Sequence, residues 1–528
     1  MHAEIPPTIP QVLARAARLF GDSAAIIEGG TRLSFRELDA QAARASAAFL
    51  ALGVQPGERV ALWAPNSAAW VIAALGAQGV GAILVPLNTR LKGKEAAFIL
   101  KRSGARVLVT VDEFLGTRYP ALLAGEALPA LEQLVLLGAP GAAVPGLPAA
   151  RGWQAFLDSG AGVAAERVQA ARAAVGPEDV ADILFTSGTT GEPKGVLSTH
   201  RQNVRVFRTW SEFVGLTAQD RYLAVNPFFH SFGYKAGWLA ALLQGATLYP
   251  LAVFDAARAL DMIEQERITV LPGPPTLYQS LLAHESLPRR DLSSLRLAVT
   301  GAASVPPILI TRMRSELKFK SVLTAYGLTE STGVVTVCPH DADDLTVATR
   351  CGIAIPGVEV RCADAEGRSV PVGEAGEVLV RGYNVMRGYF EDPRATAEAV
   401  DADGWLHTGD VGVLDDRGYL RITDRMKDVF IVGGFNCYPA EIEKLLSEHP
   451  AIAQVAVIGV PDERLGEVCK AFVVARPGAT LTPEALIAWA RDNMANYKVP
   501  RSVELVSQLP TNASGKVQKF ALRETHAR

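Results

Sequence analysis

The sequence predicts a large α/β protein followed by a smaller α+β domain. Short apolar runs typical of buried strands alternate with helical patterns over most of the first 350 residues, which indicates parallel-rich sheets covered by helices. Shorter β-rich pieces between glycines then predict a small β-barrel, and the C-terminal residues show an alternation of their own. We therefore expect an N-terminal domain at 1–424, with subdomains at 1–175, 176–350 and 351–424, and a C-terminal domain at 425–528.

The composition is that of a globular chain. Hydrophobic residues make up 49% and charged residues 20% of the 528 positions, which excludes a disordered protein. The chain has 52 basic and 55 acidic residues, and the basic ones form no long run. We therefore expect no nucleic-acid partner. The five cysteines lack CxxC spacing and the eight histidines lack an HExxH motif. These spacings argue against a disulfide framework or a zinc site, and favour a cytoplasmic protein.

The first elements follow from periodicity and capping residues. A helical pattern at 10–21 precedes a predicted strand, tight turn and strand between Ala24 and Phe35. Ser34 and Glu37 are spaced as a capping box, which predicts a helix that continues to about Leu52.

The next stretch, Ala68–Pro86, is the most membrane-like part of the chain. Gln78 and three glycines interrupt it, so we predict a buried helix and then a strand rather than a transmembrane segment. It follows a predicted strand at Arg59–Trp63 and a helix start at Asn66. Residues 138–176 are rich in Ala, Gly and Pro and predict a connection with a helix near 164–174. Further strands are predicted at 107–109, 134–137, 180–185, 221–225, 247–249, 270–271, 297–299 and 322–324.

The C-terminal part carries shorter elements. In the β-rich subdomain, strands are predicted at 358–360, 376–380 and 419–422. In the last domain, Pro439 opens a helix, and a second helix runs from Pro483 to Met494. Strands are predicted between them, at 455–460 and 471–474.

One loop has the composition of a phosphate-binding site. The apolar run Val180–Phe185 enters Thr186–Gly195, in which hydroxyls and glycines precede Pro193 and Lys194. Glycines expose backbone N–H groups to an anion, and the hydroxyls and the lysine add donors and charge. A polar surface loop is the alternative. Pro193 occupies the position where a Walker A loop requires its second glycine, so an ordinary P-loop NTPase is disfavoured.

Three further motifs are ambiguous when each is taken alone. Tyr326–Glu330 follows a predicted strand, and α/β sheets bind ligands at the ends of their strands. Tyr326 could stack on a purine and Glu330 could hold Mg²⁺. The alternative is a core tyrosine and a solvated glutamate. Asp410, after a glycine, suits a turn or an acceptor for ribose hydroxyls. Asn226–Tyr234 is rich in aromatic residues, which could line the pocket for an apolar acid. It holds one histidine, and a lone histidine is more often structural than catalytic.

Three motifs of the C-terminal region are equally open. The charged run Asp424–Asp428 usually indicates a solvated face. Ile431–Phe435 is an apolar strand that enters a glycine pair, as in a hairpin turn. Lys516 lies on a Ser-Gly loop, where most lysines are surface residues.

Taken in order, these motifs resemble those of the adenylate-forming superfamily of acyl-CoA synthetases, luciferases and peptide-synthetase adenylation domains. The likeness covers essentially the whole chain. It comprises the phosphate loop, the aromatic substrate motif, the Y-G-x-T-E motif, the T-G-D motif, the hinge with the CoA tunnel, and the catalytic lysine loop: Thr186–Gly195, Asn226–Gly233, Tyr326–Glu330, His407–Asp410, Arg425–Glu443 and Ser514–Lys516.

The resemblance implies an ATP-dependent, AMP-forming ligase that uses Mg²⁺ and coenzyme A. A carboxylic acid would form an acyl-adenylate, and a mobile C-terminal domain would then turn about a hinge at Lys427 for thioester formation. Implied ATP- or AMP-binding residues are Thr186, Ser187, Gly188, Thr189, Thr190, Lys194, Gly301, Ala302, Ala303, Tyr326, Gly327, Thr329, Asp410 and Arg425. Implied catalytic residues are Lys516, Thr329, Glu330 and His230, with Glu330 as the metal ligand. CoA would contact Gly433, Gly434 and Phe435, and the acid pocket would include His230, Phe232, Gly233 and Tyr326.

The acid is less sharply indicated than the reaction. Amino-acid-activating relatives place an acidic residue where this chain has His230, which disfavours a peptide-synthetase module, and nothing favours luciferase chemistry. Segments 226–237, 269–276 and 323–330 resemble bacterial CoA ligases of steroid ring C/D catabolism, which act on a hydrindane propanoate. A medium- or long-chain fatty acid is the alternative.

A remote alternative is a non-catalytic ATP-binding sensor on the same fold, although the residues that such a sensor could lose are all present. We expect small-molecule partners only, and the sequence leaves open whether the chain forms a homo-oligomer. Lys235 and Trp238 could lie at the pocket rim, but helix packing is the favoured interpretation.

Overall fold

The computed structural model describes residues 6–139, 141–186, 193–301, 305, 307–425, 428, 430–432, 435–437, 439–462, 465–494, 496–511 and 517–526. The chain divides into two compact units. One comprises residues Met1–Glu359 and Val380–Leu406, and the other Val360–Leu379 and His407–Arg528. The boundary expected between 424 and 425 falls inside a strand, β22 (Leu420–Arg425), and stays a prediction.

The first unit contains an eight-stranded sheet in the order β20-β11-β10-β4-β3-β5-β8-β9. The pairs from β10 to β9 are parallel, and β11 pairs antiparallel with both β10 and β20. This is the parallel-rich sheet that the alternation predicts. Its strands are β3 (Arg59–Trp63), β4 (Ile83–Pro86), β5 (Val107–Thr110), β8 (Gln133–Leu136), β9 (Ala150–Gly152), β10 (Val180–Thr186), β11 (Lys194–Thr199) and β20 (Gly388–Tyr389).

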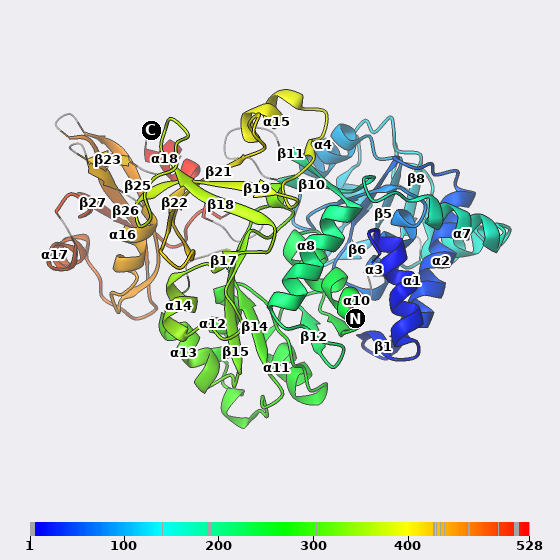
Figure 1. The fold of residues 1–528 in the computed structure, drawn as a ribbon, viewed down its shortest axis with the longest axis horizontal. Coiled ribbons are helices and arrows are strands. Elements are labelled where there is room, and N and C mark those ends of the chain that lie inside the picture. The colour runs from blue at the N-terminus through cyan, green and yellow to red at the C-terminus, as the bar shows by residue number, and fades with distance from the viewer. Residues whose placement is uncertain are drawn as a thin grey trace. The chain divides into compact units, whose positions relative to one another are not determined.

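Helices cover both faces of this sheet. On one face, α4 (Gly93–Ser103) and α5 (Tyr119–Leu122) bury apolar side chains against β3, β5 and β8. On the other lies a helical layer in which α1, α2 and α3 run side by side (Figure 1). The layer comprises α1 (Ile9–Phe20), α2 (Phe35–Ala51), α3 (Ala68–Gln78), α8 (His200–Phe213) and α10 (Ala240–Gln244), with α6 (Trp153–Ser159) and α7 (Ala165–Ala174) against α2.

Two four-stranded sheets complete the α/β part of this unit, in the orders β12-β13-β1-β2 and β14-β15-β16-β17. Val270 joins them through isolated parallel bridges to Tyr222 and Leu297. Their strands are β1 (Ala24–Glu28), β2 (Thr31–Ser34), β12 (Arg221–Ala224), β13 (Thr247–Pro250), β14 (Leu297–Thr300), β15 (Ser321–Tyr326), β16 (Thr336–Val337) and β17 (Ile353–Ala354). In the second sheet, β15 packs with α13 (Pro307–Ser315) and α14 (Asp344–Thr349); α12 (Pro275–Leu282) packs with α13, and α11 (Ala256–Gln265) with α12.

The β-rich region forms a half-barrel counterpart of the expected small barrel. It is a four-stranded sheet in the order β18-β19-β21-β22. The strands are β18 (Val358–Ala363), β19 (Ala375–Gly382), β21 (Leu406–Leu414) and β22. Smaller elements are the hairpin β6 (Glu113–Phe114) and β7 (Thr117–Arg118), the turn η2 (Leu287–Arg289) and α15 (Pro393–Ala399).

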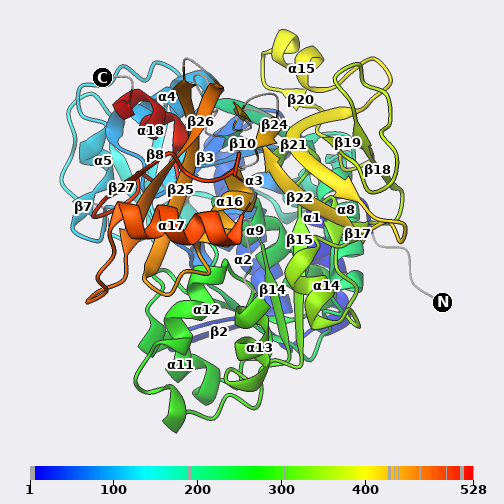
Figure 2. The same cartoon turned by 90° about the vertical axis from the view of Figure 1, so that its left-hand side faces the viewer.

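The C-terminal α+β part is built on a sheet in the order β24-β23-β26-β25, with β27 on β26. The side chains of β25, a strand labelled in Figure 2, alternate between two cores. Val457 packs with α16 and α17, whereas Ile458 packs with Leu522 of α18, as expected for a strand buried on both faces. The elements are β23 (Phe430–Val432), β24 (Phe435–Cys437), α16 (Pro439–Leu446), β25 (Ile452–Asp462), β26 (Gly466–Ala475), α17 (Pro483–Asn493), β27 (Ser502–Leu505) and α18 (Lys519–His526).

Most local predictions are confirmed, and the differences have physical reasons. Ser34 and Glu37 form the capping box of α2. Ser67 caps α3 instead of Asn66, whose amide donates to the carbonyls of Ala224 and Asn226. The strand predicted at 270–271 is reduced to the bridges of Val270.

The connection at 138–176 hides β9 and α6 as well as the expected helix, because its Ala, Gly and Pro content obscures the period. The five cysteines form no disulfide. Within the described ranges, no helix has both the length and the apolar character needed to cross a bilayer.

Candidate active site

Two of the residues predicted around adenine lie side by side at adjacent strand ends. β14 and β15 are parallel and pair Thr300 with Thr324, so Gly301 leaves its strand beside Ala325, the residue before Tyr326. A Cβ on Gly301 would lie 2.9 Å from the carbonyl oxygen of Ala325, closer than real side chains approach. A glycine is therefore required here for β14 and β15 to end together. Ala302 and Ala303 lie outside the described residues.

The Y-G-x-T-E segment forms a tight turn, η3 (Thr329–Ser331). Gly327 packs so closely on Gly333 that a Cβ would lie 2.3 Å from the Gly333 carbonyl oxygen. Thr329 and Glu330 are half-buried. One carboxylate oxygen of Glu330, Oε1, accepts a hydrogen bond from the hydroxyl of Tyr389 at 2.9 Å. The turn therefore presents a hydroxyl and a carboxylate next to the strand end that carries Tyr326.

The predicted phosphate loop closes a β-hairpin. β10 ends at Thr186, which is paired with Lys194, the first residue of β11. The Lys194 ammonium is exposed and lies 5.1 Å from the centre of the Tyr389 ring. Ser187, Gly188, Thr189 and Thr190 lie outside the described residues. The ends of the loop are thus held by a strand ladder, with Lys194 on one strand.

The aromatic substrate motif forms a short helix, α9 (Ser231–Gly233), and the π-helix η1 (Tyr234–Leu239). A Cβ on Gly233 would lie 2.1 Å from the Pro227 carbonyl oxygen, and one on Gly333 would lie 3.3 Å from the Ser231 Cβ. The motif therefore packs against the chain that follows η3. Phe232 is half-buried on α9.

His230 is solvent-accessible, but the protein around it disfavours the charged form and lowers its pKa. At neutral pH the ring is therefore uncharged. It can accept or donate a hydrogen bond, but it supplies no positive charge for a bound carboxylate.

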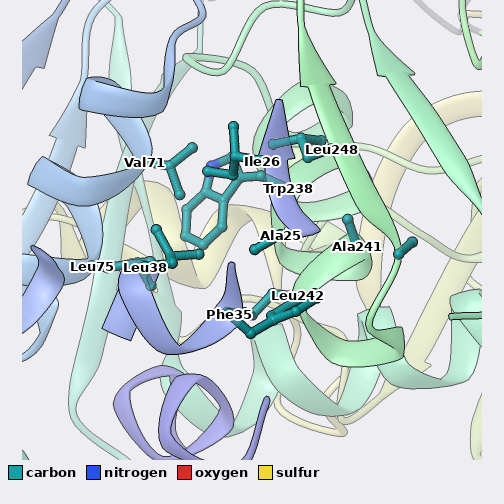
Figure 3. A pocket seen from close by; sticks show the side chains of 11 residues that line it. Ala25, Ile26, Phe35, Leu38, Val71, Leu75, Trp238, Ala241, Leu242 and Leu248 are labelled. Carbon is teal, nitrogen blue, oxygen red and sulfur yellow. The ribbon is translucent and has the colours of Figure 1, made fainter. Parts of the chain in front are cut away.

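Lys235 and Trp238 are packing residues and do not line a pocket rim. The Lys235 ammonium is fully buried, 3.0 Å from the Asp182 carboxylate and 3.0 Å from the Ser198 hydroxyl. Trp238 stacks on Tyr234, with ring centres 4.8 Å apart. It also lines an apolar pocket inside the unit, among side chains of β1, α2, α3 and α10 (Figure 3). None of the predicted site residues lines that pocket.

The second unit brings together the residues predicted to bind ribose. Asp410 on β21 is buried and paired in register with Arg425 on β22. Glu377 on β19 orders the approach to Asp410: its carboxylate accepts from the Gly409 N–H at 3.1 Å and lies 3.0 Å from His407 Nδ1. The T-G-D residues thus lie within a strand.

The predicted CoA and lysine segments have ordered flanks. β23 and β24 form an antiparallel hairpin around the glycine pair, and an antiparallel bridge joins Thr511 to Val517 on either side of Lys516. Gly433, Gly434, Lys427 and Lys516 lie outside the described residues, so their predicted roles remain predictions. α18, which follows the lysine, is held by ion pairs of Lys519 with Glu443 and of Arg523 with Asp428, each 2.9 Å.

Three residues at this site were missed by sequence reasoning: Asn66, Glu377 and Tyr389. Asn66 supports the aromatic motif, because it donates to the Asn226 carbonyl and accepts from the Phe228 N–H. All three act across 30 or more positions, and no local pattern reveals such a contact. Their only sequence signal is a polar residue beside an apolar strand or turn.

Glu330, the metal ligand expected from the sequence, could hold a cation near Lys194, because both side chains contact Tyr389. Among the residues that the structure describes, no group of three or more His, Cys, Asp or Glu side chains could enclose a metal. A single half-buried carboxylate fits Mg²⁺, which keeps several waters and takes substrate phosphates as ligands, and does not fit a closed metal cage.

Comparisons with known proteins agree with this geometry. A family profile described as AMP-binding enzyme matches residues 13–390, and one described as AMP-binding enzyme C-terminal domain matches 441–516. The chain is 51% identical over 525 residues to the 3-[(3aS,4S,7aS)-7a-methyl-1,5-dioxo-octahydro-1H-inden-4-yl]propanoyl:CoA ligase of Rhodococcus jostii, with 99% of each chain covered. It is 53% identical over 517 residues to the ligase of the same name from Mycobacterium tuberculosis, with 98% of each covered. Among solved structures, ATP-bound MatB from Rhodopseudomonas palustris superposes with a TM-score of 0.86 at 31% identity, covering 98% of this chain and 99% of MatB.

Proposed function

The chain belongs to the AMP-binding enzyme family and is an AMP-forming acyl-CoA ligase, and we propose that the acid it activates is a hydrindane propanoate. The similarity to two ligases of that substrate over nearly the full chain carries the proposal. The aromatic residues of the Asn226–Tyr234 motif and the uncharged His230 support it, because a bicyclic acid needs apolar contacts rather than a partner for an amine.

The reaction takes place in two steps. A carboxylate oxygen of the acid attacks the α-phosphorus of ATP, the bond to the β-phosphate oxygen breaks, and pyrophosphate leaves. The CoA thiolate then attacks the acyl carbon, and AMP leaves with the former carboxylate oxygen. The first step brings two anions together, so positioning and charge neutralisation supply most of the acceleration.

Each group has a part in the first step. Lys194 and the Thr186–Thr190 hydroxyls grip the β- and γ-phosphates, and Thr329 contacts the α-phosphate. Glu330 holds Mg²⁺, which neutralises phosphate charge when bound. Tyr326, Gly301, Ala302 and Ala303 surround adenine, and Gly327 gives the turn its close packing.

The second unit supplies the remaining groups. Asp410 and Arg425 fix the ribose, which the pairing of their strands supports. Lys516 reaches the carboxylate and the α-phosphate, where negative charge gathers. For the second step, the C-terminal part turns at Lys427. Pantetheine then passes Phe435 and the glycine pair Gly433 and Gly434, whose missing Cβ atoms leave room for a thin chain.

A pyrophosphate-release screen, run with and without CoA, tests this assignment. It should include the hydrindane propanoate, aryl acids and fatty acids of several lengths. We expect the highest kcat/KM with the hydrindane propanoate and formation of its CoA thioester. A higher value with a medium- or long-chain fatty acid would replace the proposed substrate. The absence of CoA-dependent turnover with every acid would contradict the ligase activity itself.

A further inference from the structure

In the first unit, Tyr389 contacts the side chains of Lys194, which is assigned to the ATP phosphates, and Glu330, which is assigned to Mg²⁺. Its hydroxyl donates to Glu330 Oε1 at 2.9 Å, and the ammonium of Lys194 lies 5.1 Å from its ring centre. A neutral phenol is the donor, so one carboxylate oxygen is engaged while the charge of Glu330 is kept. No role in the reaction described above uses this residue.

The backbone around Tyr389 is tied to the same two elements that its side chain contacts. Tyr389 pairs with Val196 of β11, and the next residue, Phe390, donates its N–H to the Gly195 carbonyl at 2.7 Å. Upstream, the Met386 N–H donates to the Glu330 carbonyl oxygen at 2.7 Å. The tyrosine is thus fixed between β11, which carries Lys194, and the turn η3, which carries Glu330.

We propose that Tyr389 is a positioning residue for adenylation, whose hydroxyl orients the Glu330 carboxylate and whose ring supports the Lys194 ammonium. This inference rests on the proposed function. The hydroxyl restricts the rotation of a carboxylate that would otherwise sample several rotamers, and leaves the other oxygen for the cation. The ring face attracts the ammonium and holds it at the end of the phosphate loop.

Two substitutions separate the hydroxyl from the ring. Tyr389→Phe keeps the ring and removes the hydroxyl, so the Mg²⁺ concentration for half-maximal adenylation should rise by about tenfold, the scale of one hydrogen bond to a charged group. The KM for ATP at saturating Mg²⁺ should stay near the wild-type value. Tyr389→Leu also removes the ring, and should in addition raise that KM by roughly two- to fivefold, the scale of an exposed cation–π contact.

A binding readout makes the test independent of turnover. Thermal stabilisation of the full-length enzyme by ATP, measured in the absence of acid over a range of Mg²⁺ concentrations, should shift to higher Mg²⁺ for Tyr389→Phe. Tyr383→Phe and Tyr383→Leu are matched controls. The Tyr383 hydroxyl donates to the Thr209 hydroxyl at 3.2 Å, and its ring lies 3.7 Å from the Arg205 guanidinium carbon. Tyr383 therefore combines a hydroxyl hydrogen bond with a cation–π contact, to residues that have no assigned role.

The effect of Tyr389→Phe should also be measured in an enzyme that carries Glu330→Gln. If Tyr389 acts through the carboxylate, Tyr389→Phe should produce no further change in Mg²⁺ dependence once Glu330 is replaced. The inference would be overturned if Tyr389→Phe shifted the Mg²⁺ dependence equally with and without the Glu330→Gln substitution, or if the Tyr383 variants showed the same shift. Neither result would contradict the ligase activity as long as the wild-type enzyme turns over. Failure of the wild-type enzyme to adenylate any acid would instead contradict the proposed function. If Tyr389→Leu fails to fold, Tyr389→Phe alone still decides the role of the hydroxyl.

Discussion

Replacement of Lys235 by methionine should strongly destabilise the first unit. Lys235 and Asp182 are both fully buried, and their charged atoms are 3.0 Å apart. Without the ammonium, the Asp182 carboxylate keeps two neutral donors, the amide of Asn203 at 2.5 Å and the hydroxyl of Tyr234, and its charge is no longer balanced. A buried charge that loses its partner costs about 3–5 kcal/mol, which is a large part of the stability of a typical domain.

A second change should reverse most of that loss. Asp182→Asn removes the unpaired charge and retains a hydrogen bond to Asn203, so the double variant should be more stable than Lys235→Met alone. Urea unfolding followed by tryptophan fluorescence, with circular dichroism as a second probe, measures both. Lys101→Met is the matched control, because Lys101 forms a partly exposed ion pair with Glu126 at 2.7 Å and should cost less than about 1 kcal/mol. A Lys235→Met variant as stable as this control, or a double variant no better than the single, would refute the reasoning.

Four further outcomes are expected. Lys516→Ala should lose adenylation by about 10²–10³-fold, and near-normal pyrophosphate release would contradict its assignment. Lys427→Pro should retain adenylate formation and impair thioester formation, measured as separate half-reactions, whereas equal loss of both would argue against a hinge. Lys194→Ala should raise the KM for ATP without abolishing turnover, and an inactive enzyme with intact ATP binding would reverse the ranking of the two lysines. Burial lowers the pKa of His200 from 6.5 to about 4, so between these pH values the unfolded chain binds a proton that the folded chain excludes. Stability should therefore fall by up to about 3 kcal/mol as the pH drops through this range, and a His200→Gln variant with an equally steep urea-midpoint profile would contradict it.

Local signals in the sequence were sufficient to predict much of the fold. The capping box of Ser34 and Glu37 predicted the start of α2, and the apolar run at 180–185 predicted β10. The glycine pair after Ile431 predicted the hairpin of β23 and β24. Each of these features depends on neighbours a few positions apart, where the physics is contained in composition and spacing.

The site was predictable as a set of motifs but not as a set of contacts. Sheet register brings Gly301 to the strand end that carries Tyr326 and pairs Asp410 with Arg425, and one sequence does not specify that register. Lys235 shows the same limit. Nothing near it in the chain indicates that Asp182, on a distant strand, neutralises its charge in the interior.

The hairpin of β10 and β11 also determines where the charge that balances a bound polyphosphate comes from. In a loop that enters a helix, the helix macrodipole adds roughly half a positive charge at the phosphate. Here the loop leads into a strand that begins at Lys194, and the net dipole of a β-sheet is small. The balance therefore falls to backbone N–H groups, an exposed ammonium and the cation. Mobile salt screens an exposed ammonium more than a buried charge pair, so we expect nucleotide binding by this enzyme to weaken as the ionic strength rises.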